Sequence, residues 1–321
     1  MQNNVYLSKQ SIFDIKQEIT TPEIELKYNS LDQFNMSNPI FKQIINDFIV
    51  VLKKNFPEEY LKNFYNNINE LKVKNKGLKL SNGQYKIDKN QILIRKNIKV
   101  SEIRGVIYHE LFHMSSSAYK KGRRYSGFSQ RTKSRKMVVG NGINEGYTEL
   151  LAHRYSKEKF DVAYLDEYNI VMYLENIVGK DEMEELYFNA DLKGLIDRLK
   201  EYSNDCEIAK FIISVDSLQK YYTEEISKIE FKQNIVNAYT FLLKTYIKKQ
   251  EIEYNKKNIS IEEFINRIGE YIYRLKLSPY TNENNTISGL EIKYILDLAL
   301  EKCNFKEKIN QKVYSIYRER C

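Results

Sequence analysis

The chain holds only three histidines, and two of them enclose a glutamate in the run His109-Glu110-Leu111-Phe112-His113. Residues four apart on an α-helix lie one turn apart on the same face, so both imidazoles could bind one metal ion. Glu110 would lie about 100° around the helix axis from His109, beside the ion. There its carboxylate could accept a proton from an attacking water molecule. The pattern predicts a hydrolase site built around a metal ion, in most cases zinc.

The flanking residues favour the helix that this geometry needs. Ser101 is expected to cap the N-terminus, and Glu102 suits the positive end of the helix dipole. Apolar residues then recur at helical spacing, at Ile103, Val106, Ile107, Leu111 and Met114. A pair of structural histidines is the alternative, and their spacing on a well-formed helix favours the metal site.

A catalytic zinc site needs a third protein ligand and leaves a fourth position for water. Glu145, Glu149 and His153 recur every four residues and would form one stripe along a second helix. A solvated helix face is the alternative, but it would carry more lysine and less glycine. Eight residues of helix separate His153 from Glu145 by about 12 Å, too far for both to bind one ion. Glu145 is the preferred third ligand, and His153 is the alternative.

The two motifs, H-E-x-x-H at 109–113 and N-E-x-x-T-E at 144–149, together resemble those of the thermolysin-type gluzincin zinc metallopeptidases. The ligands that the resemblance implies for one Zn²⁺ ion are His109, His113 and Glu145. It also implies that Glu110 is the general base. The fold that it implies is a zincin-like catalytic core.

The resemblance gives two further residues supporting roles behind the ligands. Glu149 matches a carboxylate that hydrogen-bonds a zinc-binding histidine and fixes its tautomer. Asn144 is the second residue expected directly behind the ligands. Family members use a later histidine to stabilise the oxyanion of the tetrahedral intermediate, whereas this chain has no histidine after His153. A tyrosine or an arginine could donate instead. The 26 tyrosines leave that choice open, and the substrate-binding residues also stay open.

The formal net charge is +8, but lysine, asparagine, isoleucine and tyrosine are all abundant and all have AT-rich codons. Overall basicity therefore does not indicate nucleic acid, which is not an expected partner. A local basic segment, residues 120–136, has no acidic residue; it contains Lys120, Lys121, Arg123, Arg124, Arg131, Lys133, Arg135 and Lys136. Residues 125–129 and 136–139 predict a β-hairpin here. At the rim of a cleft it would select an acidic peptide or protein substrate, and a solvated loop is the alternative.

No apolar run reaches the length of a membrane span, and the N-terminal residues lack the pattern of a signal peptide. The three cysteines are scattered and form no C-x-x-C pair. This pattern is typical of a reducing compartment. We therefore expect a cytoplasmic protein that does not associate with a membrane.

The expected fold is mainly α with a small β-sheet (α+β), with a zincin-like catalytic core and a helical C-terminal half. Three regions are predicted: residues 1–80, mostly helical; 81–160, the catalytic core; and 161–321, helical. Helices are expected over 41–56 and 58–73, and a hairpin over 83–87 and 91–95. Further along, the expected features are a helix break at 179–181, capping boxes at 260–263 and 288–291, and loops at 255–259 and 278–287.

The favoured function is zinc-dependent hydrolysis of peptide bonds with Glu110 as the general base. One alternative is a metal-binding protein without peptidase activity. Glu110 weighs against it, because a structural metal site needs no base. Another alternative is a basic module that binds nucleic acid or protein and in which the motif is incidental.

Overall fold

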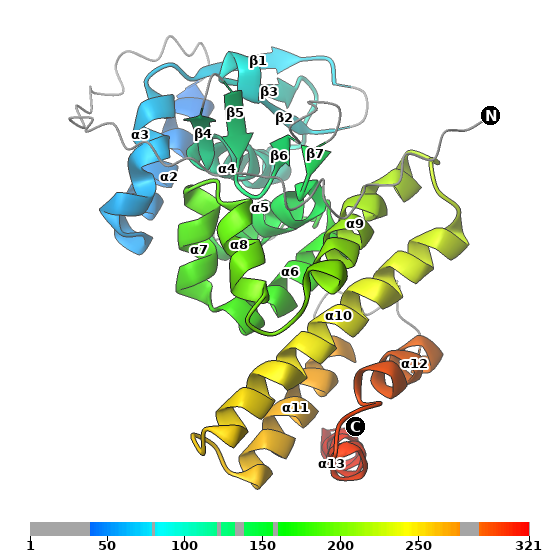
Figure 1. Cartoon of the computed structure of the whole chain (residues 1–321). Coiled ribbons are helices and arrows are strands. Elements are labelled where there is room, and N and C mark those ends of the chain that lie inside the picture. The colour runs from blue at the N-terminus through cyan, green and yellow to red at the C-terminus, as the bar shows by residue number, and fades with distance from the viewer. Residues whose placement is uncertain are drawn as a thin grey trace.

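The structure is a computed structural model that describes residues 39–78, 81–120, 123–131, 138–156, 160–276 and 289–320 (Figure 1). The described helices are α2 (Pro39–Asn55), α3 (Lys62–Ile68), α4 (Val100–Ser115), α5 (Asn141–Tyr155), α6 (Leu165–Val178), α7 (Lys180–Phe188), α8 (Leu192–Leu199), α9 (Asp205–Tyr222), α10 (Lys228–Asn255), α11 (Ile261–Lys276), α12 (Gly289–Ala299) and α13 (Lys306–Arg320). The described strands are β1 (Lys72–Lys76), β2 (Gly83–Lys86), β3 (Gln91–Arg95), β4 (Ser117–Lys120), β5 (Arg123–Ser126), β6 (Gln130–Arg131) and β7 (Val138–Val139). The expected class, mainly α with a small β-sheet, is confirmed.

The largest sheet has the strand order β1–β3–β2 and packs on α4 (Figure 1). β2 and β3 pair antiparallel, with Tyr85 opposite Ile92, so the hairpin expected before the motif helix is confirmed. The central strand is the buried one, because its residues Ile92, Leu93 and Ile94 are almost fully enclosed. Among the described strands, β2 therefore lies at an edge of the sheet, next to α4.

The helix predicted over 58–73 is too long. The structure has a 3₁₀ turn at Glu58–Leu61, and α3 ends at Ile68. Residues 72–76 form β1, which pairs parallel with β3 and places Val73 opposite Ile92. Helical periodicity could not reveal this strand, because its partner lies further along the chain. The helix predicted over 41–56 is confirmed as α2, and residues 1–38 lie outside the described residues.

The hairpin predicted from 125–129 and 136–139 is partly wrong. Tyr125 lies in β5, whose partner is β4, and it faces Ala118 there. Residues 138–139 form β7 and pair with β6 instead. The chain turns between β5 and β6 at Gly127, whose φ of 48° favours glycine. Each strand pairs with one that is closer in the sequence than the predicted partner. Residues 132–137 lie outside the described residues.

After α5, helices form nearly all of the described regular structure. Gly179 ends α6 and precedes α7, as predicted, and the Ser260 hydroxyl accepts the Glu263 N–H at the start of α11. The predicted loop at 278–287 lies outside the described residues. The long helix α10 packs against α6 and α9 and also against α11 and α12 (Figure 1). None of the described helices is long and apolar enough to cross a membrane.

Candidate metal centre

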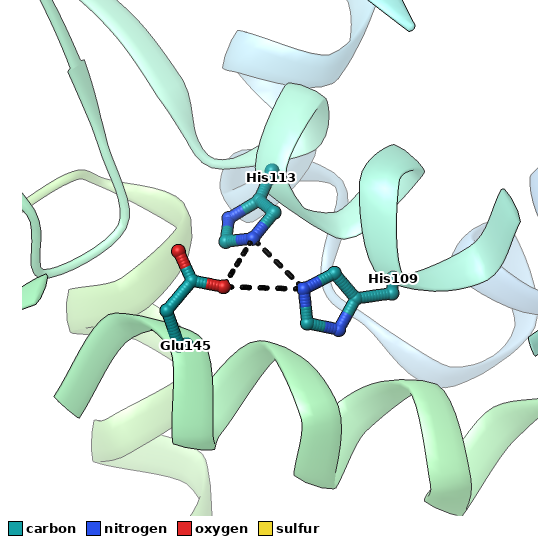
Figure 2. A group of neighbouring side chains, drawn as sticks. All are labelled: His109, His113 and Glu145. Carbon is teal, nitrogen blue, oxygen red and sulfur yellow. Dashed lines mark hydrogen bonds and ion pairs between the residues drawn. The ribbon is translucent and has the colours of Figure 1, made fainter. Parts of the chain in front are cut away.

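Helices α4 and α5 pack together and bring the two sequence motifs face to face (Figure 2). Ile107, Leu111 and Met114 of α4 are buried in the core, which fixes the rotation of that helix. His109 and His113 consequently face α5, from which Glu145 extends toward them. The helix begins at Val100 with Lys99 as its N-cap, so the predicted Ser101 cap is wrong, although Glu102 does lie in the first turn.

Three potential ligand atoms converge between these helices (Figure 2). Oε2 of Glu145 lies 3.1 Å from Nε2 of His113 and 3.3 Å from Nε2 of His109. The two imidazole nitrogens lie 3.0 Å apart. Atoms bound about 2.0–2.1 Å from one tetrahedral ion lie about 3.3 Å from one another, so this spacing fits a shared ion. In the described part of the chain, it is the one cluster of this kind that could hold a metal ion.

Glu149 supports His109 from behind. Its Oε2 lies 2.7 Å from Nδ1 of His109. Because an ionised carboxylate only accepts, the neutral ring carries its proton on Nδ1 and keeps a lone pair on Nε2. The other oxygen of Glu149 accepts the backbone N–H of Ala163 at 2.9 Å, which holds the carboxylate in place. The structure thus places Glu149 where the second motif implied.

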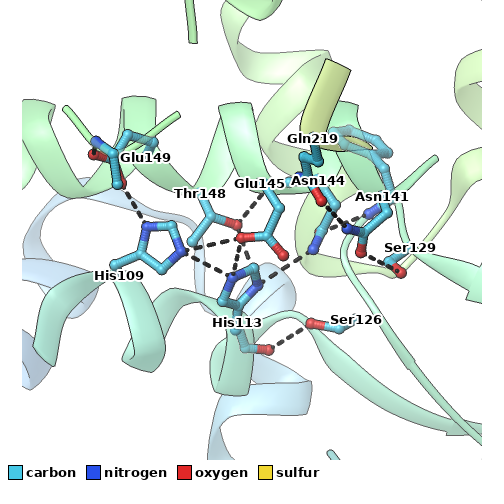
Figure 3. A network of polar contacts seen from close by, with 12 residues as sticks. His109, His113, Ser126, Ser129, Asn141, Asn144, Glu145, Thr148, Glu149 and Gln219 are labelled. Atoms are coloured by element: carbon cyan, nitrogen blue, oxygen red, sulfur yellow. Dashed lines mark hydrogen bonds and ion pairs between the residues drawn. The ribbon is translucent and has the colours of Figure 1, made fainter. Parts of the chain in front are cut away.

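Asn144 and Thr148 approach the second histidine from α5 (Figure 3). The amide nitrogen of Asn144 and the hydroxyl of Thr148 each lie 3.3 Å from Nδ1 of His113. Asn144 was a predicted site residue, whereas Thr148 was not. The signal was present, because Thr148 occupies the Ser/Thr position of the second motif.

Serine hydroxyls fix the C-terminal end of α4. The carbonyl oxygen of His113 accepts the hydroxyl of Ser117 at 2.7 Å. It also accepts the hydroxyl of Ser126 at 3.0 Å (Figure 3). Ser117 begins β4 and Ser126 ends β5. The small β4–β5 sheet therefore holds the backbone of this candidate ligand.

His153, the alternative third ligand, lies apart from the converging atoms. Its Nε2 is 3.5 Å from Oε1 of Glu149, and its ring stacks on Phe160 with centroids 3.9 Å apart. It is not a member of the cluster that could hold the ion. The geometry therefore favours Glu145 as the third ligand.

Glu110 is buried between the ligands and the edge strand β2. The backbone N–H of Tyr85 donates to its carboxylate. A Cβ atom at Gly83 would lie 2.6 Å from Oε1 of Glu110, so the absence of a side chain at position 83 makes room for it. Burial raises the pKa of Glu110. The charges of His109 and His113 lower it, but they offset only part of the increase. Glu110 is next to the candidate ligands without being one of them.

A cleft of about 800 Å³ opens beside His109 and Glu110. One wall comes from the start of β2 and from α4, and the other from residues 160–164 and the end of α9. Tyr164 lines this cleft and stacks on His109, with ring centroids 5.7 Å apart and planes inclined by 21°. Tyr164 could not be chosen from the sequence, because it lies outside both motifs and meets His109 only in the folded chain.

The basic segment 120–136 was expected at the rim of the cleft. Of its basic residues, only Lys120 and Arg131 have side chains that the structure describes, and neither lines the cleft. Lys120 instead donates to the carbonyl oxygen of Asn189, at the end of α7. The expected position is therefore wrong for Lys120 and Arg131. Residues 121–122 and 132–136, and the side chains of residues 123–124, lie outside what the structure describes.

The charges of the cluster suit a cation. Burial alone would raise the pKa of Glu145, but His113 and His109 outweigh it and hold that pKa well below its usual value. Burial also disfavours charge on His109, yet Glu145 and Glu149 raise its pKa well above 6.5. Burial would raise the pKa of Glu149, but its hydrogen bonds to His109 and His153 lower it to about 2. Two ionised carboxylates thus stabilise positive charge between them.

The start of α5 is capped by a residue from a different helix. The carboxylate of Asp216, in α9, accepts the N–H groups of Gly140 and Gly142, both at 2.8 Å. A Cβ atom at Gly142 would lie 2.5 Å from the carbonyl oxygen of Val215, so glycine permits this close approach. Capping rules look for a residue next to the helix start. Sequence reasoning therefore missed Asp216.

Comparisons of the chain with protein-family models, curated proteins and solved structures gave no match. The fold and the site define a mainly α protein with a small β-sheet and a His–His–Glu cluster that could hold a metal ion. Any narrower assignment depends on the two motifs and on the geometry around them.

Proposed function

We propose that the protein is a zinc-dependent metallopeptidase of the gluzincin type. His109, His113 and Glu145 would hold one Zn²⁺ ion. The observation that carries this proposal is the convergence of their three ligand atoms within 3.0–3.3 Å of one another. Two histidines and one glutamate are a ligand set that zinc takes in metallopeptidases. When bound, zinc would polarise the peptide carbonyl and lower the pKa of the attacking water.

Glu110 would act as the general base. It would take a proton from the attacking water and deliver that proton to the leaving amine. Its raised pKa suits this exchange, because a base that titrates closer to neutrality can both accept and return a proton. A metal-binding protein without activity would need no such carboxylate. The position of Glu110, beside the ligands and facing the cleft, therefore favours hydrolysis over that alternative.

The edge strand β2 would bind the substrate main chain. Ser81, Asn82 and Gly83 line the cleft at the start of this strand. Among the described strands β2 has no partner on the side away from β3, so an extended peptide could pair there by β-augmentation. We therefore infer that the substrate is a peptide or an unfolded protein segment. Selection of acidic substrates and a cytoplasmic location stay predictions.

Tyr164 is our candidate for the oxyanion donor that the sequence left open. The charge on Glu145, together with burial and Glu110, raises the pKa of Tyr164, so its phenol keeps the proton that it would donate. The other tyrosine of the cleft, Tyr222, already donates to Asp166 at 3.3 Å. We expect Tyr164→Phe to lower kcat at least about tenfold without changing zinc affinity. Steady-state kinetics and zinc titration would measure both, and Tyr222→Phe is the matched control. Wild-type kcat in Tyr164→Phe would exclude this role.

Digestion of a mixed peptide pool tests the proposed function itself. The zinc-loaded protein should create new peptide termini that mass spectrometry detects. Removal of the metal with a chelator should abolish the cleavage, and added zinc should restore it. Cleavage that survives chelation would contradict zinc chemistry. One bound zinc ion per chain without cleavage of any peptide would support the metal-binding alternative instead.

A further inference from the structure

We propose that Thr148, held in place by Tyr187, sets the tautomer of His113 that keeps Nε2 available to a metal ion. The inference deepens the proposed function, because its consequence for zinc binding rests on the ligand set given above. It concerns a hydroxyl on α5 and a phenol on α7, neither of which belongs to the cluster of three ligands. Thr148 and Tyr187 would be positioning residues.

The other hydrogen bonds of Thr148 allow its oxygen only to accept a hydrogen bond from the imidazole of His113. A hydroxyl has one proton to donate and two lone pairs to accept with. Thr148 donates its proton to the carbonyl oxygen of Asn144, at 2.7 Å. Its Oγ1 can then only accept, from the Tyr187 hydroxyl at 2.6 Å and from Nδ1 of His113 at 3.3 Å. This arrangement favours a proton on Nδ1 and a lone pair on Nε2, as a ligand requires.

Asn144 works in the opposite direction, so the tautomer depends on Thr148. The side-chain oxygen of Asn144 accepts the backbone N–H of Phe128 at 3.1 Å. Its amide nitrogen therefore turns toward Nδ1 of His113, at 3.3 Å. That N–H group would favour an unprotonated Nδ1 and a proton on Nε2. A proton on Nε2 would prevent this nitrogen from binding the metal. Without the acceptor that Thr148 supplies, we expect this competing tautomer to gain population.

Burial makes the arrangement rigid. The side chains of Thr148 and Tyr187 are fully enclosed, so water does not compete for their hydrogen bonds. Burial also raises the pKa of Tyr187, so the phenol retains the proton that it donates to Thr148. A Cβ atom at Gly127 would lie 2.5 Å from the ring of Tyr187, which shows how closely the β5–β6 turn packs over it.

The test measures the tautomer and the zinc affinity separately. The ¹⁵N shifts of His113 in the metal-free protein, at alkaline pH, report which nitrogen carries the proton. Competition with a chromophoric chelator gives the zinc affinity. We expect Thr148→Val to move the proton toward Nε2 and to weaken zinc binding about tenfold or more. Thr148→Ser, which keeps the hydroxyl, should retain wild-type values in both measurements, and Tyr187→Phe should fall between.

Tyr147→Phe is the matched control, because Tyr147 is also a fully buried tyrosine but its hydroxyl donates to Glu175, at 3.0 Å. A Thr148→Val protein with the proton on Nδ1 and wild-type zinc affinity would overturn the inference. Should that variant not fold, Tyr187→Phe decides: values equal to those of Tyr147→Phe would contradict the inference. If the wild type binds no zinc, the proposed function fails, while the ¹⁵N shifts still decide the tautomer.

Discussion

Glu110→Gln is expected to lower kcat for peptide hydrolysis about a thousandfold while zinc affinity stays within about threefold of wild type. The carboxylate lies outside the cluster of candidate ligands, so its neutralisation removes no metal–ligand bond. Glutamine fills the same buried space and can still accept the N–H of Tyr85 through its amide oxygen. What it cannot do is take a proton from water. The loss should therefore fall on the chemical step and not on the metal site.

Helix α4, which carries Glu110, also offers a control for this result. Glu102 also lines the cleft, but its carboxylate is occupied by the side-chain amide of Asn82, at 3.0 Å, and by Lys99, at 3.3 Å. Glu102→Gln should therefore keep kcat close to the wild-type value. Steady-state rates on one cleaved peptide, measured beside zinc titrations of all three proteins, give the comparison. A Glu110→Gln enzyme that retained most of its activity would remove Glu110 from the mechanism.

The residues that sequence reasoning found are those whose relation is local. His109, Glu110 and His113 occupy consecutive turns of one helix, so the helical repeat alone places them together. Glu145 and Glu149 are likewise one turn apart on α5. That α5 faces α4 could not be derived from helical periodicity. Only the resemblance of the two motifs to those of the gluzincins suggested it.

The residues that it missed depend on partners that are distant in the chain. Tyr187 reaches Thr148 from α7, Asp216 caps α5 from α9, and Tyr164 meets His109 across the cleft. Each of these contacts exists only after the helices have packed. For the same reason the helix predicted over 58–73 runs into the start of β1, because β1 is a strand only through its pairing with β3. Local patterns predict an element and its faces, whereas packing selects which faces meet.

A buried carboxylate packed against α5 carries the second large effect that we expect. Glu167, on α6, is 1% exposed and, among the described residues, has no hydrogen-bond partner beyond its own backbone N–H. It packs against α5 at Gly146, where a Cβ atom would lie 2.5 Å from the Glu167 carbonyl oxygen. Burial, reinforced by the charges of Asp166 and Glu145, raises the pKa of Glu167 from 4.5 to about 8. The folded protein therefore holds this carboxyl neutral at pH 7, whereas the unfolded chain ionises it.

Because the pKa of Glu167 is raised in the folded state, its contribution to stability is complete below pH 4.5 and is lost as the pH rises to about 8. A glutamine at position 167 cannot ionise, so the Glu167→Gln protein should not lose this stability as the pH rises. We expect it to raise the free energy of unfolding by on the order of 3 kcal/mol at pH 7, and to change it little near pH 4.5. Urea unfolding of the metal-free proteins at both pH values measures the difference, with the exposed Glu185→Gln as the control. An equal effect at both pH values would mean that Glu167 is not held neutral. A stability gain at pH 7 that is absent near pH 4.5 would instead show that the folded protein holds the Glu167 carboxyl in its neutral form.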